Sequence, residues 1–239
     1  MGLPLNPRYL LRNIATLYRE YGVRFPFVVV ARIFEYTACL LFRPKTFTLD
    51  GQEYRYFFHL ENPTFRIERC VEIPIALTWV DRYAPEETLE VGNVLANYRR
   101  VRHTVVDKYE KDVGVINEDI VDFQPGRSYE LIISISTLEH VGWDETPREK
   151  DKVLRALATM KSLLKPGGEM VVTMPFGANK DLDALVRAGL LGLQKLSYMK
   201  RISRQNEWRQ ASYEEVADAQ YGTPYICANA IMVGYFKRA

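Results

Sequence analysis

The feature that most constrains this sequence is a succession of short apolar runs between residues 87 and 175. The runs cover residues 88–91, 102–106, 113–117, 129–135 and 169–174. Each is almost continuously apolar, as expected of parallel strands that are buried on both faces. Residues 147–164 have the apolar spacing of a helix, which Pro147 opens and Lys165-Pro166-Gly167-Gly168 ends. This alternation predicts an α/β fold with a doubly wound, mostly parallel sheet.

Other segments refine this fold. Residues 229–238 predict a late strand, paired antiparallel with the rest of the sheet. The connections at 92–97 and 107–112 are too short to hold full crossover helices. Residues 206–210 predict either a lid over a binding site or a plain strand.

The N-terminal part does not show the alternation of strands and helices that follows it. We predict a helical and β-hairpin extension over residues 1–66, followed by the main domain over residues 67–239. Leucines and isoleucines at helical spacing predict a helix over residues 8–22. Within residues 45–59, Asp50-Gly51 is a strong two-residue hairpin turn between runs rich in Thr, Phe and Tyr.

Residues 25–42 are the most apolar stretch of the chain. The stretch has no secretory cleavage pattern, and Arg32 and Glu35 at its centre would be costly inside a bilayer. One expectation is a helix buried against the domain or against a partner subunit in a homodimer. The other is a helix lying on a membrane surface as a peripheral contact, helped by the preceding arginines, Arg8, Arg12, Arg19 and Arg24.

Composition excludes several classes of function. The formal net charge is +2 over 239 residues, and no basic stripe with interleaved aromatic residues indicates nucleic acid. The three cysteines are scattered, and there are three histidines, so we expect neither a disulfide framework nor a metal site. We therefore predict a soluble, cytoplasmic protein that can associate with a membrane through residues 25–42.

Polar residues follow the expected strands where a ligand would bind. In a doubly wound sheet, ligands bind beyond the carboxyl ends of the strands, where the strand order reverses. Glu90 and Gly92 follow the first run, Asp107 follows the second, and Asp119 follows the third. A carboxylate after the second strand can accept both hydroxyls of a ribose, and one after the third can accept from an adenine amino group. Gly92 lets the backbone approach a ligand closely.

Five motifs have the order and spacing of one enzyme family. The motifs are "LEVGN", "VVDKYE", "INEDIVDF", "YELIISISTLEHV" and "LLKPGGEMVVTMP". Over residues 86–176 the chain resembles the class I S-adenosylmethionine-dependent methyltransferases of the methyltransferase type 11 kind. The resemblance implies a Rossmann-like fold and S-adenosyl-L-methionine as the cofactor. The cofactor-binding residues that it implies are Glu90, Gly92, Asn93, Asp107, Asp119, Ile120 and Ser136. "FRIERCVEIP" is similar, less specifically, to methyltransferases of surface-glycan pathways.

The cofactor loop departs from the family pattern E/D-x-G-x-G-x-G. Val94 and Ala96 stand where the second and third glycines are usual. Those glycines admit a pyrophosphate in dinucleotide folds, and S-adenosylmethionine has none. We therefore expect a reshaped, glycine-poor loop that still binds the cofactor. The alternative is a noncatalytic homologue that acts as a binding or scaffold partner.

The segment after the fourth strand predicts the chemistry. A hydroxyl acceptor must lose its proton, and His140 is the only histidine expected in the cleft, with Glu139 beside it. The expected substrate-binding residues are Thr137, Trp143, Asp144, Phe176 and Asn179. We predict methyl transfer, by O-methylation, to a small-molecule or glycan-type acceptor. "TLEHVGWDE" does not reproduce the acid cluster of magnesium-dependent enzymes. An aminopropyltransferase would need an acidic substrate motif here, and an NAD-dependent oxidoreductase would fit Asp107 but not Asp119.

Overall fold

A computed structural model describes residues 18–60 and 62–239 of the chain. Most of the helix predicted over residues 8–22 lies outside the described residues, although residues 18–21 are helical. The helices are α2 (Phe25–Phe42), α3 (Arg69–Val80), α4 (Lys152–Ser162), α5 (Lys180–Arg187) and α6 (Tyr213–Val216), with short 3₁₀ turns at Gly22–Arg24, Thr64–Arg66, Pro85–Glu87 and Leu95–Asn97. The strands are β1 (Thr46–Leu49), β2 (Gln52–Arg55), β3 (Thr88–Val91), β4 (Thr104–Val106), β5 (Val115–Ile116), β6 (Tyr129–Ile135), β7 (Leu164–Pro175), β8 (Lys195–Arg201), β9 (Trp208–Ala211) and β10 (Ala230–Lys237).

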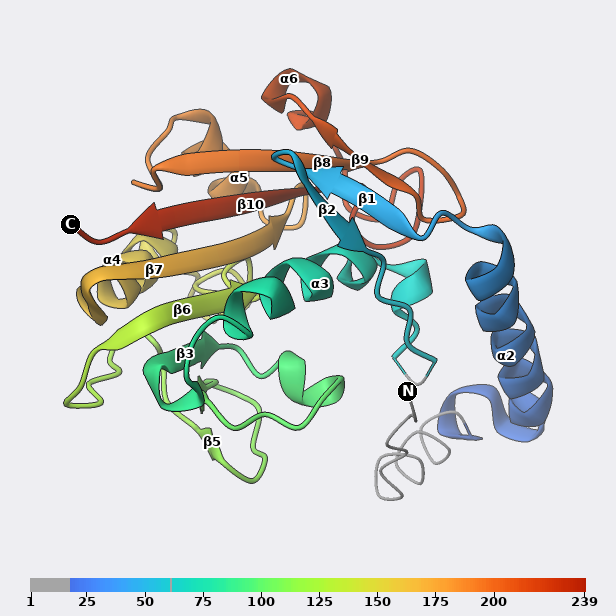
Figure 1. The fold of residues 1–239 in the computed structure, drawn as a ribbon, viewed down its shortest axis with the longest axis horizontal. Coiled ribbons are helices and arrows are strands. Elements are labelled where there is room, and N and C mark those ends of the chain that lie inside the picture. The colour runs from blue at the N-terminus through green and yellow to red at the C-terminus, as the bar shows by residue number, and fades with distance from the viewer. Residues whose placement is uncertain (1–17, 61) are drawn as a thin grey trace.

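Eight strands form the main sheet, in the order β5-β4-β3-β6-β7-β10-β8-β9 (Figure 1). The strands from β5 to β7 are mutually parallel. The strands β10, β8 and β9 then pair antiparallel, each with its neighbour. The predicted Rossmann-like sheet with a late antiparallel strand is confirmed. Residues 206–210, expected as a lid or a strand, contribute to strand β9.

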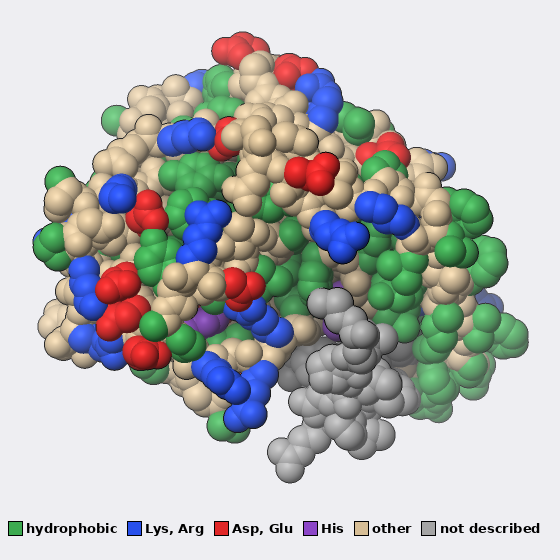
Figure 2. Space-filling model, in the orientation of Figure 1, with side chains coloured by type: hydrophobic (Ala, Val, Ile, Leu, Met, Phe, Trp, Pro, Cys, Tyr) green, Lys and Arg blue, Asp and Glu red, His purple; other side chains and the backbone are tan. Residues whose placement is uncertain are grey.

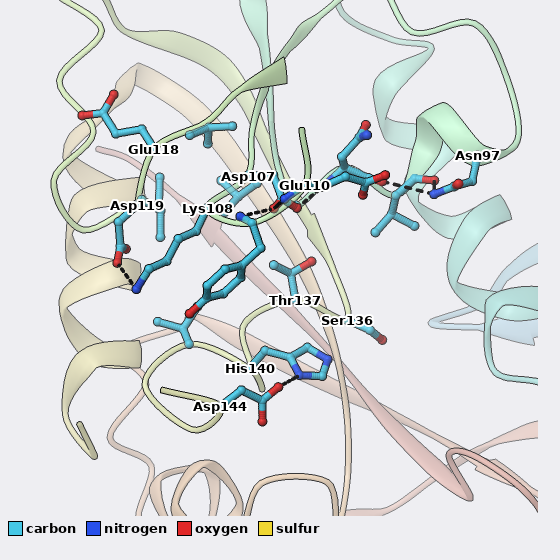
Figure 3. A pocket seen from close by; sticks show the side chains of 18 of the residues that line it. Asn97, Asp107, Lys108, Glu110, Glu118, Asp119, Ser136, Thr137, His140 and Asp144 are labelled. Atoms are coloured by element: carbon cyan, nitrogen blue, oxygen red, sulfur yellow. Dashed lines mark hydrogen bonds and ion pairs between the residues drawn. The ribbon is translucent and has the colours of Figure 1, made fainter. Parts of the chain in front are cut away.

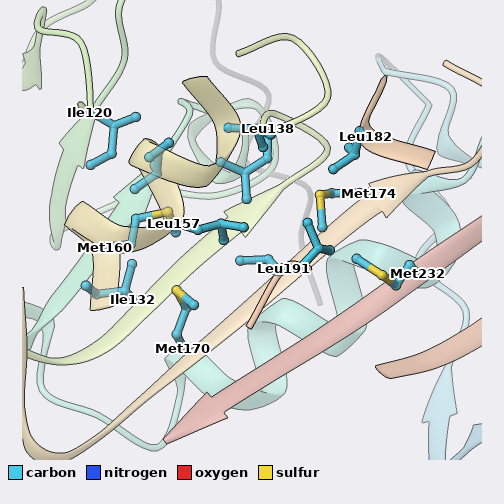
Figure 4. Close-up of a cluster of buried hydrophobic side chains, with 14 of the residues drawn as sticks. Ile120, Ile132, Leu138, Leu157, Met160, Met170, Met174, Leu182, Leu191 and Met232 are labelled. Carbon is cyan, nitrogen blue, oxygen red and sulfur yellow. The ribbon is translucent and has the colours of Figure 1, made fainter. Parts of the chain in front are cut away.

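Helices cover both faces of the sheet because side chains of a strand alternate between its faces. On β6, Leu131, Ile133 and Ile135 pack against α3. Ile132 points the other way, into a larger cluster that includes Leu157 of α4 (Figure 4). A fully buried leucine or isoleucine contributes about 1.5–3 kcal/mol. The nearly continuous apolar sequence of β6 is therefore the signature of a strand covered on both sides.

Two predicted boundaries are wrong. The helix expected over residues 147–164 begins only at Lys152, because the preceding segment folds back on itself and the Glu149 N–H donates to the Gly142 carbonyl at 2.9 Å. The residues Lys165 to Gly168, expected as a turn, belong to a β7 that already starts at Leu164 and pairs irregularly with β6. As predicted, no full helix occupies residues 92–97; a 3₁₀ turn does.

The predicted hairpin is present as a separate two-stranded sheet, with Asp50 and Gly51 in its turn. The hairpin does not stand apart from the domain, however. Phe47, Leu49 and Tyr54 share one buried cluster with residues of α3, β8 and β10. The Asp50 carboxylate also accepts from Ser197 Oγ on β8 at 2.7 Å. This hairpin is therefore part of the packed body of the domain.

Helix α2 matches the predicted span of residues 25–42, but it is not buried against the described domain. Cys39 is its one buried residue. The helical run Tyr18–Phe42 is 25 residues long, and its most apolar window has a mean hydropathy of 1.7 with 6% of its residues buried. By length and composition this run is able to cross a membrane. In Figure 1 the helix stands at the edge of the molecule, away from the main sheet.

Candidate functional site

A cavity of about 440 Å³ opens at the carboxyl ends of the parallel strands (Figure 3). Its volume is within the range of small-molecule and cofactor sites. The predicted site residues that line it are Gly92, Asn93, Asp107, Asp119, Ile120, Ser136, Thr137, His140 and Asp144. These residues come from the ends of β3, β4, β5 and β6, which the sheet topology brings together around the β3–β6 switch point. Most of the expected site therefore converges on one cavity.

The loop after β3 requires glycine at its first position. Gly92 has φ +91°, which other residues rarely adopt, and a Cβ there would lie 2.1 Å from Thr137 Oγ1. The sequence assigned Gly92 to the close approach of a ligand. The contact that excludes a side chain is instead with Thr137, a residue of the protein itself.

Glu90 lies behind this loop and does not line the cavity. The carboxylate accepts from the backbone N–H groups of Val94 at 3.0 Å and Leu95 at 2.8 Å. The other oxygen lies 2.7 Å from His103 Nε2, and both side chains are buried. Glu90 therefore fixes the shape of a loop that lacks two glycines, and its expected contact with the cofactor is not direct.

Asp107, at the end of β4, faces the cavity and also holds the backbone around it. Its Oδ2 accepts from the Asn93 N–H at 3.0 Å, and its Oδ1 accepts from the N–H groups of Tyr109 and Glu110 at 2.9 and 2.8 Å. A carboxylate offers about four lone-pair positions. The three backbone bonds leave about one position, so Asp107 can accept one ligand hydroxyl more readily than two.

Asp119 belongs to a cluster of ion pairs. Its Oδ2 lies 3.0 Å from Lys108 Nζ (Figure 3) and 2.7 Å from Lys152 Nζ. Both lysines also contact Glu145. Burial alone would raise the pKa of Asp119, but hydrogen bonds from Lys152, the Val121 N–H and Lys108 outweigh it and lower the pKa. The expected acceptor for an adenine amino group is therefore already charged and paired within the protein.

Ser136 marks the other side of the cavity and has a positive φ of 36°. Its hydroxyl donates to Glu72 Oε1 at 2.6 Å, and Arg69 Nη1 donates to Glu72 Oε2 at 2.6 Å. Glu72 is fully buried, whereas Arg69 also lines the cavity. The buried carboxylate thus holds both a cavity-lining arginine and the strained residue after β6.

His140 forms a dyad with Asp144 at the cavity mouth. Nδ1 of the imidazole lies 2.6 Å from Asp144 Oδ2, and the pair is exposed (Figure 3). With Nδ1 donating to the carboxylate, Nε2 is left as a proton acceptor. This is the arrangement of an oriented general base.

Glu139, expected as a second catalytic residue, is buried and does not line the cavity. Its Oε1 lies 3.7 Å from His140 Nε2, and its Oε2 has no hydrogen-bond partner. Burial raises the pKa of the Glu139 carboxyl well above its usual range. The carboxyl is therefore a buried neighbour of the imidazole and lies outside the cavity lining.

Three expected substrate-binding residues do not line the cavity. Phe176 is packed in the main hydrophobic core. Asn179 is buried as the N-cap of α5, where its side chain accepts from the N–H groups of residues 181 and 182. Trp143 lies against Arg148, whose guanidinium stands 4.0 Å from the ring centre. Phe176 and Asn179, which follow β7, therefore serve the fold, whereas Trp143 is held outside the cavity lining against Arg148.

Several lining residues had not been assigned from the sequence: Arg69, Asn97, Tyr98, Lys108, Tyr109, Glu110 and Glu145. The run of charges from Arg66 to Glu72, at the start of an otherwise apolar helix, was an available signal for Arg69. Charges in such a place usually indicate a buried ion pair. Lys108 and Tyr109 offered no comparable pattern, because their position depends on how the loop after β4 folds.

The cavity fits a cationic, hydrogen-bonding cofactor. Six lining carboxyl groups (Asp107, Glu110, Glu118, Asp119, Asp144 and Glu145) face two lining cations (Arg69 and Lys108). Asn93, in the wall, has a buried Oδ1 without a hydrogen-bond partner, so an acceptor is available for a ligand donor. Within the described part of the chain, no group of three or more His, Cys, Asp or Glu side chains is placed to hold a metal ion.

Solved structures of similar fold include several methyltransferases. The N-methyltransferase NodS from Bradyrhizobium japonicum, in complex with S-adenosyl-L-homocysteine, is 12% identical, with a TM-score of 0.45 over 72% of this chain and 87% of that one. A TehB-like methyltransferase from Corynebacterium glutamicum is 17% identical, with a TM-score of 0.39 over 68% and 86%. The sugar N-methyltransferase KedS8 from Streptoalloteichus is 13% identical, with a TM-score of 0.36 over 72% and 89%.

No protein-family model matches the sequence, and no curated protein matches it either. Similarity at these identities and TM-scores does not assign an activity to this chain.

Proposed function

We propose that this protein is an S-adenosylmethionine-dependent methyltransferase that methylates a hydroxyl group of a small-molecule or glycan-type acceptor. One observation carries the proposal. The loop after β3, Asp107 after β4, Asp119 after β5 and the segment from Ser136 to His140 after β6 all line a single cavity. These are the strand-end positions at which a doubly wound sheet binds a nucleoside-containing ligand.

The charge of the cavity supports this choice of cofactor. S-adenosylmethionine carries a positive sulfonium. The lining has six carboxyl groups for two cations, and it stays negative when Lys152, which pairs with two of these acids from outside the lining, is included. A negative cleft with low-dielectric walls attracts a cationic ligand. The Asn93 Oδ1, which has no partner, lies beside Asp107. It can accept a hydrogen bond from a ribose hydroxyl or from an amino group of the ligand.

The His140–Asp144 dyad supports transfer to oxygen. When bound, the cofactor supplies an electrophilic methyl group, so the protein has to align the acceptor and remove its proton. Asp144 holds Nδ1–H of His140 at 2.6 Å, which leaves Nε2 to take the hydroxyl proton. An amine acceptor in its neutral form would not need this base.

The test is the formation of S-adenosylhomocysteine by the full chain with a panel of hydroxyl-bearing acceptors, followed by mass spectrometry. We expect product with at least one small-molecule or glycan acceptor, and a loss of product in His140→Ala. If the protein binds S-adenosylhomocysteine but forms no product with hydroxyl, amine or thiol acceptors, the proposed activity is wrong.

That outcome would favour a noncatalytic binding or scaffold protein. The specific observation behind this second candidate is the adenine side of the cavity. Asp119 is already paired with Lys108 and Lys152, and Val94 and Ala96 replace the usual glycines. A cavity whose charges are already paired within the protein gains less free energy from binding a ligand.

A further inference from the structure

Helix α2 presents to solvent a continuous apolar stripe with no charge. The side chains of Phe27, Val30, Phe34 and Leu41, with Val23 in the 3₁₀ turn just before the helix, are between 65% and 83% exposed. Their spacing of four, three, four and seven residues places them on one side of the helix (the last interval being two turns). In Figure 2 the green side chains gather at the same edge of the molecule at which Figure 1 draws α2.

The charged residues of α2 lie on the opposite side. Between Phe25 and Phe42 the only charged residues are Arg32 and Glu35. Glu35 pairs with Arg66 of the domain, and the neighbouring Tyr36 ring lies 5.9 Å from the ring of Phe65. The one hydroxyl near the stripe, that of Thr37, donates to the helix's own Ile33 carbonyl at 2.9 Å. The outward surface therefore offers no polar group that needs a protein partner.

A basic cleft of about 380 Å³ adjoins the helix where Glu35 contacts the domain. Three arginines, Arg66, Arg201 and Arg204, line it with Glu35 as the one acid, so these four side chains sum to +2. Arg201 is buried and makes four hydrogen bonds, all to backbone carbonyls, which hold the loops that shape the cleft. Ile226, also in the lining, is 59% exposed.

We propose that α2 and this cleft together form a membrane-docking surface, in which the apolar stripe enters one leaflet of an anionic bilayer and Arg204, the exposed arginine of the cleft, binds a phospholipid phosphate. Apolar side chains that cannot be buried in the protein gain free energy by entering the acyl region. Arginine forks match phosphate oxygens bidentately. The two features lie side by side through Glu35, so one membrane surface can engage both.

The contacts of α2 favour a helix lying in the membrane plane over a spanning one. Glu35, Tyr36 and Cys39 hold the helix against the domain near its middle. A spanning helix would draw these contacts, and the Arg66 pair, into the hydrocarbon layer, where charges are costly. A second copy of the chain is a weaker occupant, because protein interfaces have polar rims. The residues flanking the stripe are themselves apolar: Pro26, Ala31, Ile33, Ala38 and Leu40.

Co-sedimentation of the full chain with vesicles tests this surface. The wild-type protein should bind phosphatidylcholine vesicles that contain phosphatidylglycerol more strongly than pure phosphatidylcholine vesicles. Phe27→Asp/Phe34→Asp should weaken binding to both by roughly 100-fold, because each phenylalanine is lost from the acyl region. Arg204→Glu should weaken binding to the anionic vesicles about fivefold or more and leave binding to the neutral ones unchanged.

The matched control is Val113→Asp/Leu190→Asp, which also replaces two exposed apolar residues by acids, away from α2. It should bind as the wild type does. All of these positions are exposed, so thermal unfolding should show a folded protein in each case. Wild-type binding by Phe27→Asp/Phe34→Asp would overturn the proposal. A wild-type dimer that binds no vesicles and dissociates in that variant would do so too, since a second copy would then cover the stripe.

Discussion

The two ends of the cavity differ in how far their charged side chains are paired. At one end, which we call the paired end, Asp119 and Glu145 contact Lys108 and Lys152, so two acids meet two bases. Hydrogen bonds with Lys152 and Lys108 overcome the effect of burial and lower the pKa of Glu145, as they do for Asp119. The charges at this end are paired with one another, and these ion pairs form part of the cavity wall.

The other end, the acid-rich end, has three buried acids behind the cavity wall, around the lining residue Arg69. Glu68, Glu72 and Glu139 all interact with Arg69, and Glu139 Oε2 has no partner. Burial, with the nearby Glu72, raises the pKa of Glu68, and burial likewise raises that of Glu139. This end therefore favours a bound proton or a cation. The paired end is therefore structural. At the acid-rich end Arg69 and the adjoining His140 line the cavity, and the proposed ligand chemistry is assigned to that side.

The largest expected effect is at the paired end. Lys152→Met removes a buried ammonium and leaves Asp119 and Glu145 to share Lys108. Breaking a buried ion pair in this way should lower the free energy of unfolding by about 3 kcal/mol. Urea denaturation measures it, with Lys150→Met as a control at an exposed lysine, where the change should stay within about 0.5 kcal/mol. A loss below about 1 kcal/mol would mean that the paired end is no more than a surface network.

At the opposite end, the expected effect is on rate. His140→Ala removes the proposed base and should reduce turnover at least about 100-fold. Affinity for S-adenosylhomocysteine and thermal stability should change little, because the side chain is exposed and pairs only with the exposed Asp144 among its close contacts. Asp144→Asn should lower turnover in the same direction. Full activity in His140→Ala would point to an amine or thiol acceptor, or to another base.

The loop between the two ends gives a third test. Gly92→Ala should cost about 2 kcal/mol of stability, from the positive φ and from the contact with Thr137. Adding Thr137→Ala should restore most of the part due to the contact, because Oγ1 and Cγ2 are removed and the Thr137 Cβ at 2.9 Å remains, and should leave the part due to φ. If the double variant is no more stable than Gly92→Ala in chemical denaturation, the contact with Thr137 is not what excludes a side chain.

The smallest expected effect concerns pH at the acid-rich end. Because burial raises the pKa of Glu139, the folded chain keeps a proton that the unfolded chain releases above its ordinary value of 4.5. Wild-type stability should therefore fall as the pH rises above that value. Glu139→Gln, which mimics the protonated acid, should match the wild type near pH 4, below the ordinary value of the carboxyl. It should become the more stable of the two, by about 1 kcal/mol, in thermal unfolding at high pH. A constant difference across pH would contradict the raised pKa.

The sequence predicted those parts of the fold that depend on local pattern. Thr88–Val91 and Tyr129–Ile135 were bounded correctly, because a strand buried on both faces must be apolar throughout. The start of α4 was misplaced, since a backbone bond between Glu149 and Gly142 folds that segment back, and no periodicity reveals such a bond.

In the candidate site, too, some residues could be placed from the local sequence pattern and others could not. The acids at strand ends could be placed at the cavity, because parallel strands end at one edge of the sheet. Their partners could not be foreseen. The pairing of Asp119 with Lys152 joins a loop to a helix 33 positions later in the chain, and Asn179 turned out to cap α5 instead of facing the cavity. Such contacts depend on how loops pack in three dimensions.

Isothermal titration calorimetry with S-adenosylhomocysteine tests the central claim most directly, namely that this cavity binds the cofactor. Wild-type protein should bind one equivalent, and Asp107→Ala should bind at least about tenfold more weakly, because a ligand hydroxyl loses its acceptor. Asp107 also accepts three backbone N–H groups, so the variant must first be shown to be folded by circular dichroism. No binding to the wild type, or unchanged affinity in a folded Asp107→Ala, would contradict the account.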